Sequence, residues 1–342
     1  MTHSGHHSSR QWAPTCRLET LRVRAEAYAR IRTFFQERNV LEVETPVLGS
    51  STATDPFLAS VPASLSLSPG QPGRQFFLHT SPEFPMKRLL AAGTGAIYQI
   101  CKTFRDGESG RRHNPEFTML EWYRPDFNLC QLMAEVAELV MRVLGNESVR
   151  VHHLSYREAF GRYLGIDPFC ITDTELEQLT QQKTGFITSD KEAAPLSRDD
   201  CLNLLLTSCI EPELGREESG DAALCFLYAY PASQASLARL TRDDSGQLVA
   251  ERFELYIQGL EIANGYFELT DAQEQGRRFE EDNRQRRQLG LPQIPLDKHL
   301  LSALSAGLPV CSGVALGLDR LLMIKLKVHA IEEVISFPVD RV

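Results

Sequence analysis

The stretch FRDGESGRRHNPEF, residues 104–117, decides the fold because it places cations, glycines and a histidine between two segments with β-strand alternation. We predict strands over residues 97–105 and 116–124, joined by this polar loop. Alternation turns Arg105 away from the apolar face of the first strand. The loop therefore predicts an anion-binding site, and the alternative is a surface hairpin whose arginines are solvated.

The returning strand carries a second set of chemically useful side chains on one face. Phe117, Met119, Glu121 and Tyr123 alternate along it and combine an aromatic ring, a carboxylate and a phenol. Such a face suits a ligand that has a base, a phosphate and an amine.

The segment LEIANGYFEL, residues 260–269, contains an Asn-Gly pair, which is a strong signal for a two-residue type I′ turn. A turn at Asn264-Gly265 would oppose Glu261 and Glu268, with their Cβ atoms roughly 5 Å apart. Opposed like charges are destabilising unless a cation lies between them, and Mg²⁺ prefers oxygen ligands. The pattern favours a Mg²⁺ site, and the alternative is an exposed hairpin whose carboxylates splay into water.

The segment SGVALGLDR, residues 312–320, predicts a strand of small residues that leads into an apolar helix. Its glycines allow a ligand to approach the backbone closely, although tight strand–helix packing uses glycines too. Arg320 has a planar guanidinium that suits a nucleotide base or a terminal phosphate.

The rest of the chain predicts helices and short connections around these strands. Helices are expected over residues 18–38, 129–144, 271–289 and 297–306 and from 320 onward, with a short helix from TSPE (80–83) to near 93 and a loop over 60–74. Residues 146–220, with the capping box Ser155-x-x-Glu158, predict a small helical insertion. Residues 1–16 are expected to form a flexible tail, and its histidines to lack a metal role.

Composition is that of one large soluble globular domain, with 342 residues, 42% hydrophobic and 24% charged. The net charge of −9 argues against a nucleic-acid backbone as the default partner. The eight cysteines form no C-x-x-C pair, and no apolar run suits a signal peptide or a membrane span. We therefore expect a cytoplasmic protein with reduced thiols and no membrane partner.

Together these segments resemble the three motifs of class II aminoacyl-tRNA synthetases. VLEVETP (40–46) resembles motif 1, residues 104–121 resemble motif 2, and residues 313–320 resemble motif 3. The resemblance implies an α/β (α+β) catalytic domain over residues 17–342, with an antiparallel sheet flanked by helices. It also implies a homodimer, because motif 1 builds the dimer interface in that family.

Within the class, TSPE (80–83), HNPEFT (113–118) and EIANG (261–265) resemble lysyl-tRNA synthetases. The resemblance starts near residue 18, so we expect no anticodon-binding domain. FTMLEWYRP (117–125) and PASQASLA (231–238) resemble the ligases of elongation factor P, which are lysyl-tRNA synthetase paralogues. That family uses ATP to activate (R)-β-lysine as an adenylate and transfers it to a lysine of elongation factor P. The alternatives are an enzyme that charges tRNA or another amine with lysine, and a non-catalytic paralogue.

The resemblance also assigns the site residues. ATP is expected at Arg105, Asp106, Gly107, His113, Asn114, Phe117, Glu261, Ile262, Gly317 and Arg320. The amino acid is expected at Ser81, Pro82, Glu83, Glu121, Tyr123, Glu268 and Ala315. Mg²⁺ is expected at Glu261 and Glu268, and the catalytic set is Arg105, Arg320, Glu261 and Glu268.

Two positions depart from the family pattern. Ala315 stands where lysyl-tRNA synthetases have glycine, and its methyl group is expected to disfavour α-lysine relative to the β isomer. Gly107 stands where motif 2 usually has a glutamate, and Glu108 follows it.

Overall fold

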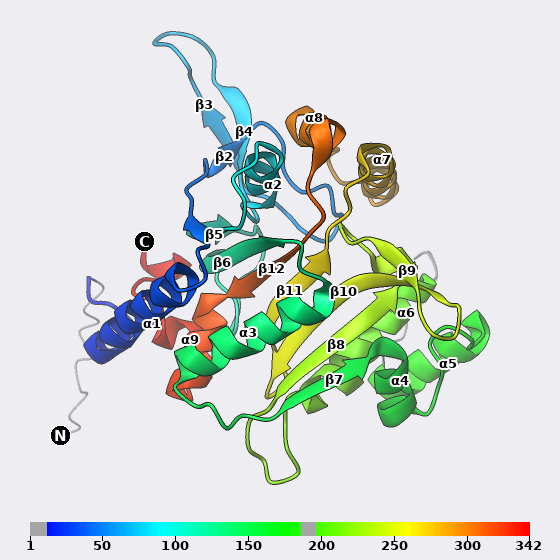
Figure 1. Ribbon diagram of the computed structural model, residues 1–342. Coiled ribbons are helices and arrows are strands. Elements are labelled where there is room, and N and C mark those ends of the chain that lie inside the picture. Colours follow the sequence, from blue (N-terminus) through cyan, green and yellow to red (C-terminus); the bar gives the residue numbers. More distant parts are fainter. Residues whose placement is uncertain (1–11, 186–195) are drawn as a thin grey trace, which may run out of the picture.

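The computed structural model describes residues 12–185 and 196–342, and its centre is a nine-stranded sheet (Figure 1). The strand order is β1-β5-β6-β12-β11-β10-β8-β7, with β9 beside β10. Pairing is antiparallel from β5 to β8 and parallel at the ends, β1 with β5 and β7 with β8. The strands are β1 (Leu41–Glu42), β5 (Ile97–Phe104), β6 (Glu116–Pro125), β7 (Val151–Ser155), β8 (Leu224–Pro231), β9 (Leu240–Arg242), β10 (Leu248–Ile257), β11 (Leu260–Phe267) and β12 (Cys311–Gly317). The predicted antiparallel sheet with flanking helices is confirmed.

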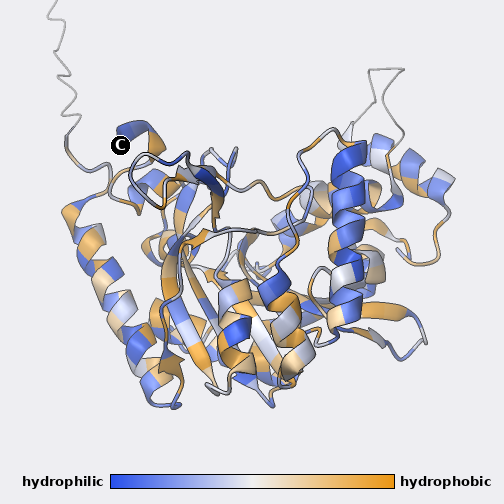
Figure 2. Ribbon diagram, turned by 90° about the horizontal axis from the view of Figure 1, so that it is seen from above, coloured by the Kyte–Doolittle hydropathy of each residue, from blue (hydrophilic) through white to orange (hydrophobic). Residues whose placement is uncertain are grey.

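One face of the sheet is covered by α1 (Leu18–Gln36), α3 (Leu129–Leu144) and α9 (Leu318–Leu326). Leu120 and Trp122 of β6 point into this core, as their alternation with Met119, Glu121 and Tyr123 predicts. Hydrophobic and hydrophilic residues alternate along α1 (Figure 2), and its apolar side buries Phe35 against Tyr98. These helices therefore bury this face of the sheet in the main hydrophobic core.

Two separate groups of helices cover the opposite face. The first group, α4 (Tyr156–Leu164), α5 (Asp173–Thr184), α6 (Arg198–Leu205) and the π-helix η1 (Leu206–Ile210), packs over β7, β8 and β10. The second group, α2 (Glu83–Ala91), α7 (Ala272–Gln288) and α8 (Lys298–Gly307), packs over β5, β6 and β12. The middle of this face therefore stays open between the groups.

The expected helical insertion contains the first group, together with the 3-10 turn η2 (Glu211–Glu213). The capping box is confirmed: Ser155 accepts a hydrogen bond from the amide of Glu158, and Glu158 accepts one from the amide of Ser155. β7 attaches the segment to the edge of the main sheet. The expected tail falls largely on residues 1–11, which lie outside the described residues.

The predicted loop over 60–74 is wrong at its ends. β3 (Pro62–Leu65) pairs with β4 (Arg74–Leu78), which also pairs with β2 (Leu48–Gly49). The three form a small sheet that projects from the body (Figure 1). Backbone pairing holds β3 although its composition is poor in strand-forming residues.

The predicted turn at Asn264-Gly265 is also wrong. β11 runs without a break through both residues, and the turn between β10 and β11 lies at Gln258 and Gly259, both of which have positive φ. Gly265 serves packing instead, because a Cβ there would lie 2.5 Å from the ring of Phe253.

This correction changes how Glu261 and Glu268 are related. They lie on one chain segment seven residues apart, a spacing that normally places side chains on opposite faces. A bulge removes the mismatch, because Leu255 pairs with Ala263 and Tyr256 pairs with Glu261, which leaves Ile262 as the extra residue. Both glutamates line the open face, but their Cα atoms are roughly 20 Å apart along the strand.

Candidate active site

A cavity of about 940 Å³ occupies the open face of the sheet, between α2 and the strands β6, β11 and β12. It brings together eight of the residues predicted for the site: Ser81, Glu83, Arg105, Glu121, Tyr123, Glu261, Glu268 and Ala315. We call this cavity the reaction cleft.

Two carboxylates at one end of the reaction cleft hold a buried lysine. Lys87 is 1% exposed, and its Nζ lies 2.6 Å from Glu83 and 2.6 Å from Glu268. Burial disfavours the ammonium, but Glu268 and then Glu83 outweigh it and raise the pKa of Lys87 above its ordinary value. An amine bound here would therefore meet carboxylates that already accommodate an ammonium group.

Glu121 forms the floor beside this group. It accepts hydrogen bonds from the hydroxyls of Ser81 (2.6 Å) and Tyr123 (2.7 Å). Burial, followed by the charge of Glu83, raises the pKa of Glu121 to about 8. Glu121 is consequently protonated for the most part at neutral pH, until a cation lowers its pKa.

Two residues of β12 shape the same floor. A Cβ at Gly313 would lie 2.3 Å from the ring of Tyr123 and 2.6 Å from Oε1 of Glu268, so only glycine fits there. Ala315 pairs with Glu121 on one side and with Asn264 on the other, and it lines the cleft. The Ala315 methyl group therefore occupies space at the floor of the cleft that a glycine at this position would leave empty.

Arg105 lies at the other end of the cleft. Its guanidinium is 5.1 Å from the ring centroid of Phe117 and 3.6 Å from Glu108. Gly107 has a φ of 77°, a left-handed conformation in which glutamate would be strained. The departure at residue 107 thus has a conformational reason, and Glu108 supplies the nearby carboxylate.

Arg320 and His113 meet next to Glu261, although they are far apart in sequence. Nη2 of Arg320 lies 2.6 Å from Nε2 of His113, and Nη1 donates to the backbone carbonyl of Glu261 at 2.9 Å. Arginine can only donate, so this ring nitrogen accepts and the imidazole is neutral. Burial, followed by the charge of Arg320, lowers the pKa of His113, which agrees with that state.

A second carboxylate close to Glu261 is Glu254 on the neighbouring strand β10, rather than Glu268. Burial of the carboxyl group, followed by the charge of Glu254, raises the pKa of Glu261. Glu254 is fixed by hydrogen bonds from Tyr230 and Arg252. The described residues contain no group of three or more histidine, cysteine or acidic side chains placed to hold a metal. Two carboxylates fit a Mg²⁺ ion that takes its remaining ligands from a nucleotide.

Several predicted residues do not line the reaction cleft with their side chains. The amide of Asn114 is engaged by the backbone, since its nitrogen donates to Glu116 (2.6 Å) and its oxygen accepts from Val339 (3.0 Å). Ile262 is buried in the core, Pro82 is the N-cap of α2, and Gly317 is the N-cap of α9. Asp106 is exposed.

Lys87, Arg252 and Glu254 are site residues that the sequence analysis missed. Lys87 follows Glu83 by four residues on a predicted helix, and that ion-pair spacing was a usable signal. Arg252 and Glu254 are two residues apart on β10, which places them on the same strand face, but the local sequence does not distinguish a ligand-binding face from a solvent-exposed one.

Comparisons with known proteins agree with this geometry. Residues 13–341 match the family of class II tRNA synthetases (D, K and N). The chain is 48% identical over 331 residues to the elongation factor P–(R)-β-lysine ligase of Salmonella paratyphi B, covering 96% of this chain and 98% of that protein. The ligase of the same name from Pectobacterium atrosepticum is 47% identical over 330 residues, with the same coverage.

Proposed function

Because this chain belongs to the class II tRNA synthetase family, we propose that it is an ATP-dependent ligase that activates (R)-β-lysine and transfers it to a lysine side chain of elongation factor P. The observation that carries this proposal is one continuous cleft with two chemically different ends. Glu83, Glu121 and Glu268 in the cleft suit the amines of the substrate. Arg105 in the cleft suits the phosphates of ATP, as does Arg320, which contacts the cleft residue Glu261.

The first step is attack of the β-lysine carboxylate on the α-phosphorus of ATP. The new bond joins a carboxylate oxygen to phosphorus, and the bond to the β-phosphate oxygen breaks to release pyrophosphate. Arg105 stabilises the charge that develops on the α-phosphate, and Phe117 stacks on the adenine. Arg320, held by His113 and Glu261, faces the outer phosphates.

We propose Glu254 and Glu261 as the protein ligands of Mg²⁺, in place of the pair Glu261 and Glu268. When bound, the ion would neutralise charge on the phosphates of ATP. Glu268 suits the substrate amine better, because it already holds the ammonium of Lys87.

In the second step the ε-amine of the acceptor lysine attacks the carbonyl carbon of the adenylate. A C–N bond forms, the bond from that carbon to the phosphate oxygen breaks, and AMP leaves with the electron pair. The nitrogen loses a proton to solvent, which gives the amide. No side chain of the enzyme forms a covalent bond in this sequence.

We further propose that the protein works as a cytoplasmic homodimer. Leu41, Val47 and Leu48 are large apolar residues in or next to the motif 1 segment that are 54%, 37% and 37% exposed, which supports a partner surface. All eight cysteines are free, which suits a reducing compartment. None of the helices in the described part of the chain has the length and hydropathy to cross a bilayer.

The test is to incubate the protein with ATP, (R)-β-lysine and elongation factor P, and to measure the mass of elongation factor P by mass spectrometry. We expect a gain of one β-lysyl unit on one lysine. Arg105→Lys keeps the charge but loses the planar fork, so we expect pyrophosphate exchange to fall by about 100-fold. Arg112→Lys, an exposed arginine on the same loop, is the matched control and should retain activity. An unmodified acceptor with the wild-type enzyme would contradict the proposal.

A further inference from the structure

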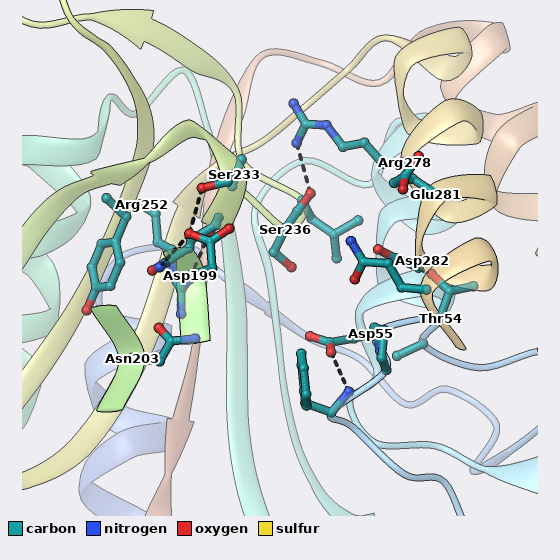
Figure 3. A pocket seen from close by; sticks show the side chains of 18 of the residues that line it. Thr54, Asp55, Asp199, Asn203, Ser233, Ser236, Arg252, Arg278, Glu281 and Asp282 are labelled. Carbon is teal, nitrogen blue, oxygen red and sulfur yellow. Dashed lines mark hydrogen bonds between the residues drawn. The ribbon is translucent and has the colours of Figure 1, made fainter. Parts of the chain in front are cut away.

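A second cavity, of about 910 Å³, opens beside the reaction cleft, between the insertion and α7. It shares Arg252, Glu254 and Glu261 with the reaction cleft, and Asp55 and Phe57 line both. Figure 3 shows Asp199 and Asn203 on one side of it and Glu281 and Asp282 on the other. The space therefore leads from the surface to the place where the adenylate would form.

The wall of this cavity is strongly acidic. Nine carboxylates and three arginines line it, with no lysine among the described residues. Each arginine already pairs with a glutamate of the same wall: Arg252 with Glu254, and Arg277 and Arg278 with Glu274. Asp55, Asp199 and Asp282 have no cation within 4 Å in the part of the chain that the structure describes. They accept hydrogen bonds from the backbone or from neutral side chains only.

An unsatisfied buried amide also faces the same cavity. Gln275 of α7 is 1% exposed and lines the cavity, and its side-chain nitrogen has no hydrogen-bond partner among the described residues. A buried donor without a partner is costly, so it indicates an acceptor group that arrives with a ligand. A peptide carbonyl is such a group.

These two observations select among the substrates of the proposed reaction. Apart from Glu254 and Glu261, which we assign to Mg²⁺, the carboxylates of this wall would repel ATP and pyrophosphate, and a tRNA end is disfavoured for the same reason. The amino acid has its own carboxylate-lined site in the reaction cleft. The remaining substrate is the acceptor protein, which brings a lysine side chain and backbone carbonyls.

We propose that this acidic cavity receives the lysine-bearing loop of the acceptor protein. Asp55, Asp199 and Asp282 attract its basic side chains, Gln275 donates to a backbone carbonyl, and Phe57, 76% exposed at the rim, offers an apolar contact. This inference rests on the proposed function, because it names the route by which the second substrate reaches the adenylate.

The test measures the two half-reactions separately in full-length enzyme. In the double variant Asp199→Asn/Asp282→Asn, the KM for the acceptor protein should rise roughly tenfold, which corresponds to about 1.4 kcal/mol. Pyrophosphate exchange with β-lysine should stay within about twofold of wild type, as should aminolysis of the adenylate by hydroxylamine. The control Glu218→Gln/Asp244→Asn removes the same charge from exposed positions outside the cavity and should leave the acceptor KM unchanged.

Two single variants cover the case in which the double variant folds poorly. Asp199→Asn alone keeps an oxygen for the hydroxyl of Ser233, and Gln275→Leu removes the donor without adding charge. Each should raise the acceptor KM and spare exchange. An acceptor KM equal to that of the control in all these variants would overturn the docking site while the proposed function stands. No transfer by the wild-type enzyme would overturn both.

Discussion

Lys87 is a buried cation that neutralises Glu83 and Glu268 at one end of the reaction cleft. Replacing it with methionine keeps its length but leaves Glu83 and Glu268 facing each other without a counter-charge. Breaking a buried ion pair from one side costs about 3–5 kcal/mol. We therefore expect Lys87→Met to lower the free energy of unfolding by that amount in urea titrations.

Exposed Lys298 has no ion pair among the described residues and provides the control, since Lys298→Met should change stability by less than about 0.5 kcal/mol. The double variant Lys87→Met/Glu268→Gln should recover part of the loss. Equal stability of Lys87→Met and wild type would show that the ion pairs do not form.

Ala315 sets the depth of the cleft floor between Glu121 and Asn264. Removing its methyl group should admit α-lysine, whose amine branches next to the carboxylate. One methyl group in a pocket is worth about 1–3 kcal/mol of discrimination. We expect Ala315→Gly to raise kcat/KM for α-lysine in pyrophosphate exchange by about tenfold or more relative to β-lysine. An unchanged ratio would remove Ala315 from the specificity determinants.

At the level of elements, strand β11 depends on a glycine that makes room for an aromatic ring. An alanine at 265 would press its Cβ against Phe253, and overpacking of this kind costs about 1–3 kcal/mol. We expect Gly265→Ala to destabilise the protein by that amount in thermal or urea unfolding. The cost should shrink in a Phe253→Leu background, because the two residues are coupled through direct contact.

Gly276 in α7 is the matched control. A Cβ there meets only the side chain of Leu301 at 4.0 Å, and alanine is the better helix former. Gly276→Ala should therefore be neutral or stabilising. Identical losses at both positions would argue against the packing explanation.

Across the whole molecule, buried carboxyl groups link stability to pH. Burial raises the pKa of Glu121 to about 8 and, as the leading cause, raises that of Glu211 to about 7. The ordinary pKa in the unfolded chain is about 4.3, so the folded state binds protons that the unfolded state has lost. The stability that these groups contribute is present below pH 4.3 and is lost as the pH rises toward 8.

We expect the free energy of unfolding to be larger at pH 6 than at pH 8.5, as measured in urea without substrates. Glu121→Gln removes the group with the higher pKa of the two and should flatten this dependence. Exposed Glu147→Gln is the control and should keep the wild-type slope. A slope of the opposite sign would contradict the proton-linked burial.

Local sequence patterns determined much of this protein. The strands β5 and β6, the amphipathic α1 and the capping box at Ser155 follow from period and capping chemistry, which act between neighbours in the chain. Strand alternation also predicted that Arg105 points away from the apolar core and that Glu121 and Tyr123 share a face. All three line the reaction cleft.

Only the tertiary structure decided which distant residues meet. The Asn-Gly pair in β11 has the local signature of a turn, yet the ring of Phe253 on β10 makes Gly265 a packing residue. The bulge at Ile262 then sends Glu261 and Glu268 to one face, where Glu261 lies near Glu254 and Glu268 holds Lys87. These pairings depend on strand register and burial, and contacts between distant segments set both.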